Sequence, residues 1–147
     1  MEALHKEIGE SLGALTSLVQ RYLSKKLREE FEQRGFDLPI EHWVILRCLW
    51  IQDGLIQQEL AEAIHKDKTT VTRAVNVLEK MNILVRIPDG QDKRHKRLFL
   101  THKGKVLQNR LNPLAKEIHS IAEHEIPEQD LATCKRVLRQ IIKNLNH

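Results

Sequence analysis

Apolar residues recur at intervals of three and four along most of this chain, the spacing that places side chains on one face of an α-helix. The first such stretch runs from Leu4 to about Gln33 and predicts one amphipathic helix of about eight turns, ended by Gly35. A helix this long extends beyond any core that one copy of so small a chain could build. Its apolar stripe therefore needs a partner, either another terminal segment or a second chain.

The middle of the chain predicts three helices. The first begins at Leu38-Pro39, because proline suits the first helical position, and continues to the turn at Asp53-Gly54. Residues 57–64 form the second, which is short. Asp67 is a good N-cap for the third, since its carboxylate can accept from free backbone N–H groups in the first turn. Asn82 falls where this third helix should end in a left-handed residue, a conformation that asparagine tolerates.

Two short β-compatible runs follow, Leu84–Ile87 and Leu98–Leu100. A polar loop of about ten residues separates them, so they predict a β-hairpin. Residues near Leu55 could form a further short strand.

Two more amphipathic helices complete the chain. Thr101 is expected to cap the first, and Pro113 lies inside it and predicts a kink. The second follows the break at Ile126-Pro127. The elements together predict a mainly α fold with a small β-hairpin wing: a winged helix-turn-helix flanked by long helices.

Composition fits one domain with helical extensions, and the distribution of charge adds a functional hint. The 147 residues are 41% hydrophobic and 30% charged, with a net charge of +4. Residues 65–105 hold 11 Lys/Arg against 4 Asp/Glu, a balance of +7, whereas the remainder holds 13 against 16, a balance of −3. A basic block suits binding to a polyanion, although a solvated lysine-rich surface explains the charge alone equally well.

Several functional classes lack their sequence signals. No apolar run approaches the roughly 18 residues of a membrane span, and the N-terminus does not resemble a signal peptide. Cys48 and Cys134 lie far apart without a CxxC pattern, so we expect free thiols in a reducing cytoplasm. No Gly-rich phosphate loop, HExxH or GxSxG motif occurs, so we expect neither an enzyme nor a bound cofactor.

Short motifs between residues 60 and 104 carry a family resemblance. They are Leu60-Ala61, Thr70-Val71-Thr72-Arg73, Leu78-Glu79-Lys80, Asp92-Lys93-Arg94, and Leu100-Thr101 with Gly104. With them the chain resembles the MarR family of bacterial and archaeal transcriptional regulators, and the flanking helices agree in order and length along nearly the whole chain. The wing Asp-x-Arg followed by Leu-Thr and Gly is the most specific of these motifs. Asn82, where the family usually has Gly, and His95, where Asp or Ser is common, depart from the pattern.

The resemblance implies a homodimer that binds double-stranded DNA at a pseudo-palindromic operator, acting as a repressor that a small-molecule signal releases. Two half-sites one helical turn apart require a two-fold dimer of matching spacing. We accordingly expect an N-terminal dimerisation helix (1–37), a winged-helix DNA-binding domain (38–104) and C-terminal dimerisation helices (105–147). The candidate dimer contacts are Leu12, Leu15, Val137, Ile141 and Leu145.

The third helix and the hairpin supply the candidate DNA contacts. An α-helix fits the major groove, where threonine hydroxyls can donate, Arg73 can clamp a guanine edge or a phosphate, and Asn76 can read adenine or bond to the backbone. The resemblance implies that Arg94 enters the minor groove, whereas Asp92 holds the shape of the loop, because phosphate repels a carboxylate. The candidate DNA-binding residues are Lys68, Thr69, Thr70, Thr72, Arg73, Asn76, Lys93, Arg94, Lys96 and Arg97.

Several alternatives stay open at this point. His42, Trp43 and Trp50 are candidates to line an effector pocket, although aromatic residues at helical spacing more often belong to a core. Cys48 is a candidate redox sensor, but a buried inert thiol suits its apolar surroundings better. A metal-responsive regulator is a further alternative; its candidate cluster, His119, Glu123 and His124, lacks the HxxxH spacing of zinc-responsive relatives, so we expect no metal site. A winged-helix module that binds proteins within a transcription assembly is the remaining alternative, and no membrane partner is expected.

Overall fold

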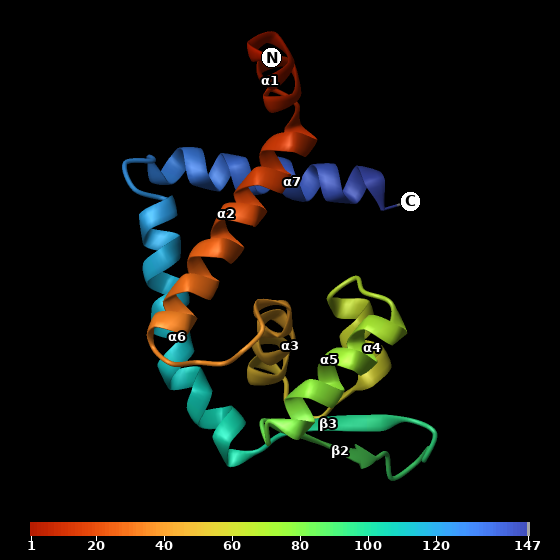
Figure 1. The fold of residues 1–147 in the computed structure, drawn as a ribbon. Helices are drawn as coiled ribbons and strands as arrows, with labels where there is room; N and C mark the ends of the chain where they lie inside the picture. Colours follow the sequence, from red (N-terminus) through yellow and green to blue (C-terminus); the bar gives the residue numbers. More distant parts are fainter. Residues whose placement is uncertain (147) are drawn as a thin grey trace.

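The computed structural model describes residues 1–146, except for the side chain of His5, and is mainly helical with one small sheet. The fold class predicted from the sequence is confirmed. A winged helix built from α3, α4, α5 and the sheet lies at one end, and α6 leads from it to α7 at the other (Figure 1). The elements are α1 (Glu2–Gly9), α2 (Leu12–Gln33), α3 (Ile40–Ile51), β1 (Leu55–Ile56), α4 (Gln57–Ala63), α5 (Lys68–Lys80), β2 (Leu84–Pro88), β3 (Lys96–Leu100), α6 (His102–Ala122) and α7 (Glu128–Leu145).

The sheet is antiparallel, with strand order β1-β3-β2. Leu84 pairs with Leu100 at one end of the hairpin, and Pro88 pairs with Lys96 at the other. The predicted loop of about ten residues was too long, because Pro88, Lys96 and Arg97 continue the ladder and leave residues 89–95 as the connection. The small strand β1 extends the sheet by pairing Leu55 with Leu98.

Local signals at the helix ends act as predicted. Oδ1 of Asp67 accepts from the backbone N–H of Thr70 at 2.8 Å and so caps α5. Asn82 adopts the expected left-handed conformation after α5, with φ of 59°. Oγ1 of Thr101 accepts from the backbone N–H of Gly104 at 3.1 Å at the start of α6. These local predictions are confirmed.

Two helix boundaries differ from the prediction. The single N-terminal helix is wrong: α1 ends at Gly9 and α2 starts again after Ser11, whose Oγ accepts from the N–H of Ala14 at 3.1 Å. Serine competes for backbone groups inside a helix and favours its N-cap, so the chain restarts there. Pro39 precedes α3 as its N-cap instead of opening it. Pro113 lies inside α6, which is helical on both sides of it, and the kink there stays a prediction.

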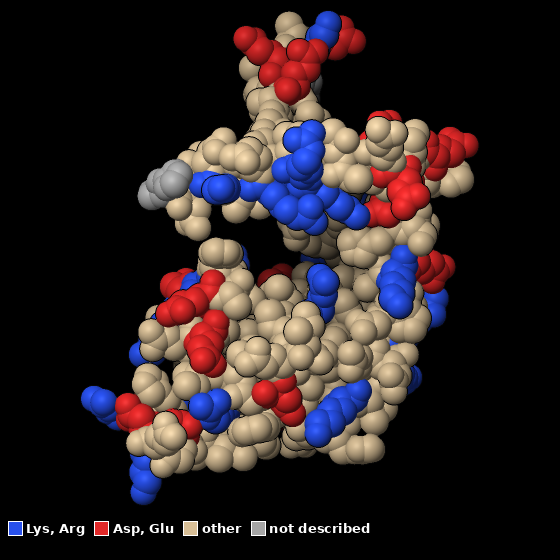
Figure 2. Space-filling view, turned by 180° about the vertical axis from the view of Figure 1, so that it is seen from behind, with Lys and Arg blue, Asp and Glu red and all other residues tan. Residues whose placement is uncertain are grey.

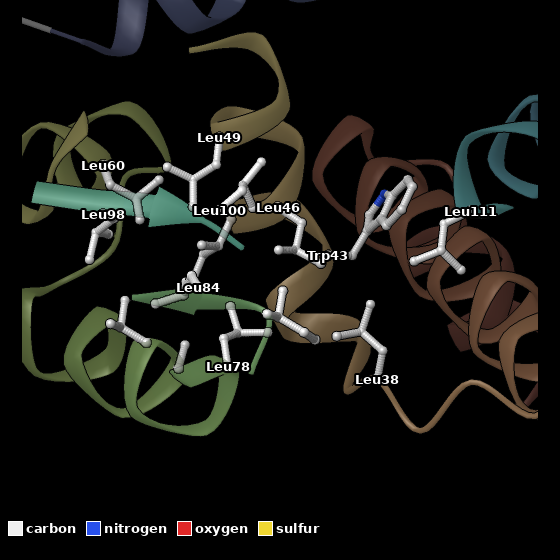
Figure 3. Packing of buried hydrophobic residues seen from close by; sticks show 14 of the residues in the cluster. Leu38, Trp43, Leu46, Leu49, Leu60, Leu78, Leu84, Leu98, Leu100 and Leu111 are labelled. Carbon is white, nitrogen blue, oxygen red and sulfur yellow. The ribbon is translucent and has the colours of Figure 1, made fainter. Parts of the chain in front are cut away.

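The core lies between α3, α5 and the sheet and continues to the pair formed by α2 and α6 (Figure 3). Leu46, Leu60 and Leu84 are fully buried there. Trp43 makes edge contacts with Phe31 of α2 and with Trp50, each at 5.4 Å between ring centroids. These contacts fix the long helices against the winged helix.

The ends of the chain bury much less. None of the residues of α7, all of them described, is buried. Leu12, Leu15, Val137 and Leu145 are exposed, and Ile141 is half-buried. An apolar stripe therefore remains uncovered on both terminal segments of a single copy. Within the described residues, none of these helices is long and apolar enough to cross a membrane.

Candidate nucleic-acid interface

The N-terminal end of α5 and the tip of the wing meet at one hollow of about 400 Å³. Three cationic side chains line it, one from α5 and two from the wing, and its lining includes no carboxylate. Lys and Arg also project from the wing end in the view from behind, at the lower left, with acidic residues beside them (Figure 2). The residues that line the hollow are Ile56, Gln57, Gln58, Lys68, Arg94, His95 and Lys96.

The helix α5 presents its polar face because its apolar face is used by the core. Val71, Ala74, Val75 and Leu78 are buried, which turns the intervening polar positions outward. Lys68, Thr69 and Arg73 are exposed, and their side chains have no partner within residues 1–146. These three side chains are thus free to bind a ligand from solvent.

The other two threonines of α5 use their hydroxyl protons inside the protein. The hydroxyl of Thr70 donates to Oδ2 of Asp67 at 2.6 Å, and these bonds lower the pKa of the Asp67 carboxyl. The hydroxyl of Thr72 donates to the Lys68 carbonyl at 2.8 Å and accepts from Nε2 of Gln57 at 2.7 Å. A hydroxyl has one proton, so neither Thr70 nor Thr72 has a hydroxyl donor left for a ligand. Their methyl groups can still contact one.

Asp92 binds the arginine two residues later in the wing. Its carboxylate accepts from the backbone N–H of Arg94 at 3.0 Å, from Nε at 3.1 Å and from Nη2 at 3.0 Å. These bonds lower the pKa of Asp92 and raise that of Arg94. The Arg94 side chain is nevertheless 90% exposed. An exposed ion pair contributes little, so Arg94 can exchange this partner for another anion.

Arg97 anchors the base of the wing. Its Nε donates to Oδ1 of Asp89 at 2.6 Å, and its Nη1 donates to the Gly54 carbonyl at 2.9 Å. Its predicted position along DNA phosphates stays a prediction, because two of its five donors already have partners within the fold. Lys93 and Lys96 are exposed and have no partner among residues 1–146. Asp89, which sequence reasoning missed, could have been noticed in the Pro-Asp-Gly turn.

A second arginine, also missed from the sequence, joins β2 to α5. Nη2 of Arg86 donates to Oδ1 of Asn76 at 2.5 Å and to Oε1 of Glu79 at 3.0 Å. No local pattern reveals this contact, because it depends on how β2 packs against α5. Asn76 is therefore exposed but not free.

Comparison with known proteins agrees with this geometry. The model of the MarR family matches residues 38–96. The transcriptional regulator YybA of Bacillus subtilis, of the helix-turn-helix type, is 29% identical over 145 residues, which span 99% of this chain and 90% of the relative. A MarR transcriptional regulator from Methanosarcina mazei Go1 is 26% identical, with a TM-score of 0.81 over 90% of this chain and 94% of that one. MepR of S. aureus, in a complex with DNA, is 26% identical with a TM-score of 0.84, covering 92% of this chain and 98% of MepR.

The chain belongs to the MarR family. The family's wing motif, Asp92-Lys93-Arg94, forms the tip of the hairpin, and its Gly104 is buried at the start of α6. A Cβ at Gly104 would lie 2.2 Å from the Ile83 carbonyl oxygen, so this MarR-family glycine permits α6 to approach the backbone just before β2 closely.

The aromatic candidates for an effector pocket lie within the core of this MarR-family protein. Trp43 is buried, and Nε1 of Trp50 donates to the Gly104 carbonyl at 2.9 Å. His42 is half-buried; its buried Nδ1 has no hydrogen-bond partner among the described residues, and burial lowers its pKa. The two tryptophans thus pack against their neighbours, and their role in a pocket stays a prediction.

The candidate sensor residues show ordinary surroundings. Cys48 is half-buried, and burial raises the pKa of its thiol, which disfavours the reactive thiolate. Glu123 lies 3.8 Å from Nζ of Lys135, an ion pair that joins α6 to α7. Within the described part of the chain, no three His, Cys, Asp or Glu side chains come together as metal ligands do.

Proposed function

We propose that the protein is a homodimeric, sequence-specific DNA-binding transcriptional regulator. Its helix α5 enters the major groove, and Arg94 of the wing enters the adjacent minor groove. The observation that carries this proposal is the hollow between α5 and the wing, where Lys68, Arg94 and Lys96 line one surface without a carboxylate. Three converging cations suit a phosphate backbone. The likeness to MepR, whose structure contains DNA, supports the same orientation.

The dimer is proposed from the uncovered apolar surface. Leu12 and Leu15 on α2 and Val137 and Leu145 on α7 are exposed in one copy, and burying them against a second copy would remove apolar area from water. We accordingly assign residues 1–37 and 105–147 to dimerisation and residues 38–104 to DNA binding. A two-fold dimer places two copies of α5 on two half-sites, which makes the operator pseudo-palindromic.

Selection of duplex sites from a random pool tests this function. We expect the full chain to enrich a two-fold symmetric motif with half-sites about one helical turn apart. Affinity for that motif should fall steeply as salt rises, since phosphate contacts release counterions. A chain that enriches no motif and binds duplexes with a flat salt dependence would refute DNA binding and favour the protein-interaction alternative. Repression, release by a small-molecule signal and a cytoplasmic location stay predictions.

A further inference from the structure

Asn76 lies on the exposed side of α5, where the proposed function puts the major groove. It follows Thr69 by seven residues and Arg73 by three, so the three side chains share one face of the helix. Its side chain is exposed, but its oxygen already has a partner inside the protein. That oxygen accepts from Nη2 of Arg86, on the neighbouring strand β2, at 2.5 Å.

Arg86 is itself held in place by a carboxylate. Its Nη2 donates to Oε1 of Glu79 at 3.0 Å, and its backbone N–H donates to Oε2 of the same residue at 3.2 Å. These bonds lower the pKa of Glu79, so the carboxylate stays charged and offsets the guanidinium. The Arg86 side chain is 26% exposed, much less than the 90% of Arg94. Arg86 is therefore a positioning residue for Asn76 and not a free cation.

The contact with Arg86 decides which way the Asn76 amide faces. A side-chain amide has an oxygen that accepts and an NH₂ group that donates, whereas a guanidinium can only donate. The Asn76 atom next to Arg86 must therefore be the oxygen. The NH₂ group is turned away from Arg86, so α5 offers two hydrogen-bond donors at this position.

This orientation restricts the base that Asn76 can read. Asparagine recognises adenine with both ends of its amide: the oxygen accepts from N6 and the NH₂ donates to N7. In this chain Arg86 bonds to one of the two lone pairs of the oxygen and holds that oxygen towards β2. The two ends of the amide then do not face a base together, and the NH₂ donors are the end left for the base. Donors match the acceptor edges of guanine (N7 and O6) and thymine (O4). Adenine offers its N7 acceptor but places its own N6 donor beside it, and cytosine presents its N4 donor.

We propose that Arg86 makes Asn76 a donor-only reader, so that the base facing Asn76 is selected as guanine or thymine and not as adenine. This inference rests on the proposed function and adds a sequence preference to it. The preference belongs to the pair of side chains, because Asn76 alone could present either end of its amide to a base.

Site selection followed by affinity measurement on single-base variants of the selected duplex tests the proposal. Asn76→Ala identifies the base position that Asn76 contacts, because the base preference at that position should disappear in this variant. At that position we expect the wild-type chain to favour guanine or thymine over adenine on the order of tenfold. Arg86→Met frees the amide oxygen, so adenine should gain on the order of tenfold relative to guanine or thymine there, with the other positions unchanged.

Asn76→Asp provides a second variant that does not disturb the packing of β2. The carboxylate still accepts from Arg86 but presents an acceptor to the base, so the preferred base should change to cytosine or adenine, which present an NH₂ donor in the major groove. Lys93→Met is the matched control for loss of charge. Lys93 has no partner among residues 1–146, so this variant should weaken binding to all single-base variants alike.

The outcomes separate the inference from the proposed function. A wild-type two-fold motif that Asn76→Ala leaves unchanged at every position would overturn the inference while the proposed function stands. A wild-type preference for adenine at the Asn76 position would overturn it as well. If the chain selects no motif at all, the proposed function is refuted, and the inference that rests on it is refuted as well.

Discussion

Replacement of Gly104 by alanine tests how tightly the winged helix is joined to α6. The added Cβ would lie 2.2 Å from the Ile83 carbonyl oxygen and 3.1 Å from Cδ2 of Leu100. The carbonyl belongs to the backbone, and it also accepts from the backbone N–H of Thr101 at 3.0 Å, so it cannot turn aside alone. The first turn of α6 must move instead.

The expected magnitude follows from the contacts that this movement disturbs. Forcing an extra methyl group into a packed site costs about 1–3 kcal/mol. Weakening the hydrogen bond from Trp50 to the Gly104 carbonyl adds about 1 kcal/mol. We therefore expect Gly104→Ala to lower the free energy of unfolding by roughly 2–4 kcal/mol, and the melting temperature by about 10 °C.

Equilibrium unfolding in urea, followed by circular dichroism at one fixed protein concentration, measures this loss. The fixed concentration matters because association stabilises the folded state by mass action. Gly13→Ala is the matched control, since Gly13 lies in α2 and a Cβ there meets nothing within 4 Å. That control should leave stability unchanged or raise it by up to about 1 kcal/mol. Equal stability of Gly104→Ala and wild type would show that α6 does not need the close approach, and the reasoning would fail.

Three further predictions concern the wing, a helix cap and acid. Arg94→Ala should weaken operator binding about tenfold or more at fixed salt, with an unchanged melting temperature, because its exposed ion pair contributes little to folding; an unchanged affinity in a binding titration would contradict this role. Asp67→Ala removes the cap of α5 and should lower the melting temperature by a few degrees, whereas Asp67→Asn, which keeps an accepting oxygen, should recover most of the loss in the same melting experiment. Because the pKa of His42 is lowered in the folded state, the unfolded chain takes up a proton at higher pH than the folded chain does, and stability should fall as pH drops below about 6.5. A plot of the urea midpoint against pH should show this fall for wild type, and His42→Phe should remove it. Carboxylates with a lowered pKa act in the same direction at lower pH. Their stabilisation is present above their ordinary pKa values, 3.8 for Asp and 4.5 for Glu, and is lost as pH falls through the lower folded-state values; these residues are Asp67, Glu79, Asp89 and Asp92.

Features that depend on a few neighbouring residues could be predicted from the sequence. The cap at Asp67, the left-handed Asn82 and the cap at Thr101 each follow from the chemistry of one residue at a helix end. The long apolar periodicity likewise predicted the mainly α fold. The break before Ser11 shows the limit of this reasoning, because periodicity continues across it and one serine decides where α2 begins.

Contacts between distant residues could not be predicted in the same way. The sequence suggested that Asn76 and Arg97 face DNA, but each bonds to a residue on another element: Asn76 to Arg86, and Arg97 to Asp89 and Gly54. Such pairs depend on strand register and packing, which place residues 8 to 43 positions apart within hydrogen-bond distance. A pattern of exposed polar residues therefore locates the surface but does not say which polar groups remain free.

Hydrogen bonds join the start of α6 to the end of α5, so the two elements should move together. Lys103 donates to the Met81 carbonyl at 2.8 Å, and the hydroxyl of Thr101 donates to the Asn82 carbonyl at 2.5 Å. The winged helix must therefore follow any tilt of α6, which at 21 residues is a lever of about 30 Å. A tilt of about 10° at its far end carries the winged helix roughly 5 Å, which exceeds the ~3.4 Å rise between base pairs. A small change of angle at the far end of α6 is thus enough to move the wing and α5 by more than one base-pair step.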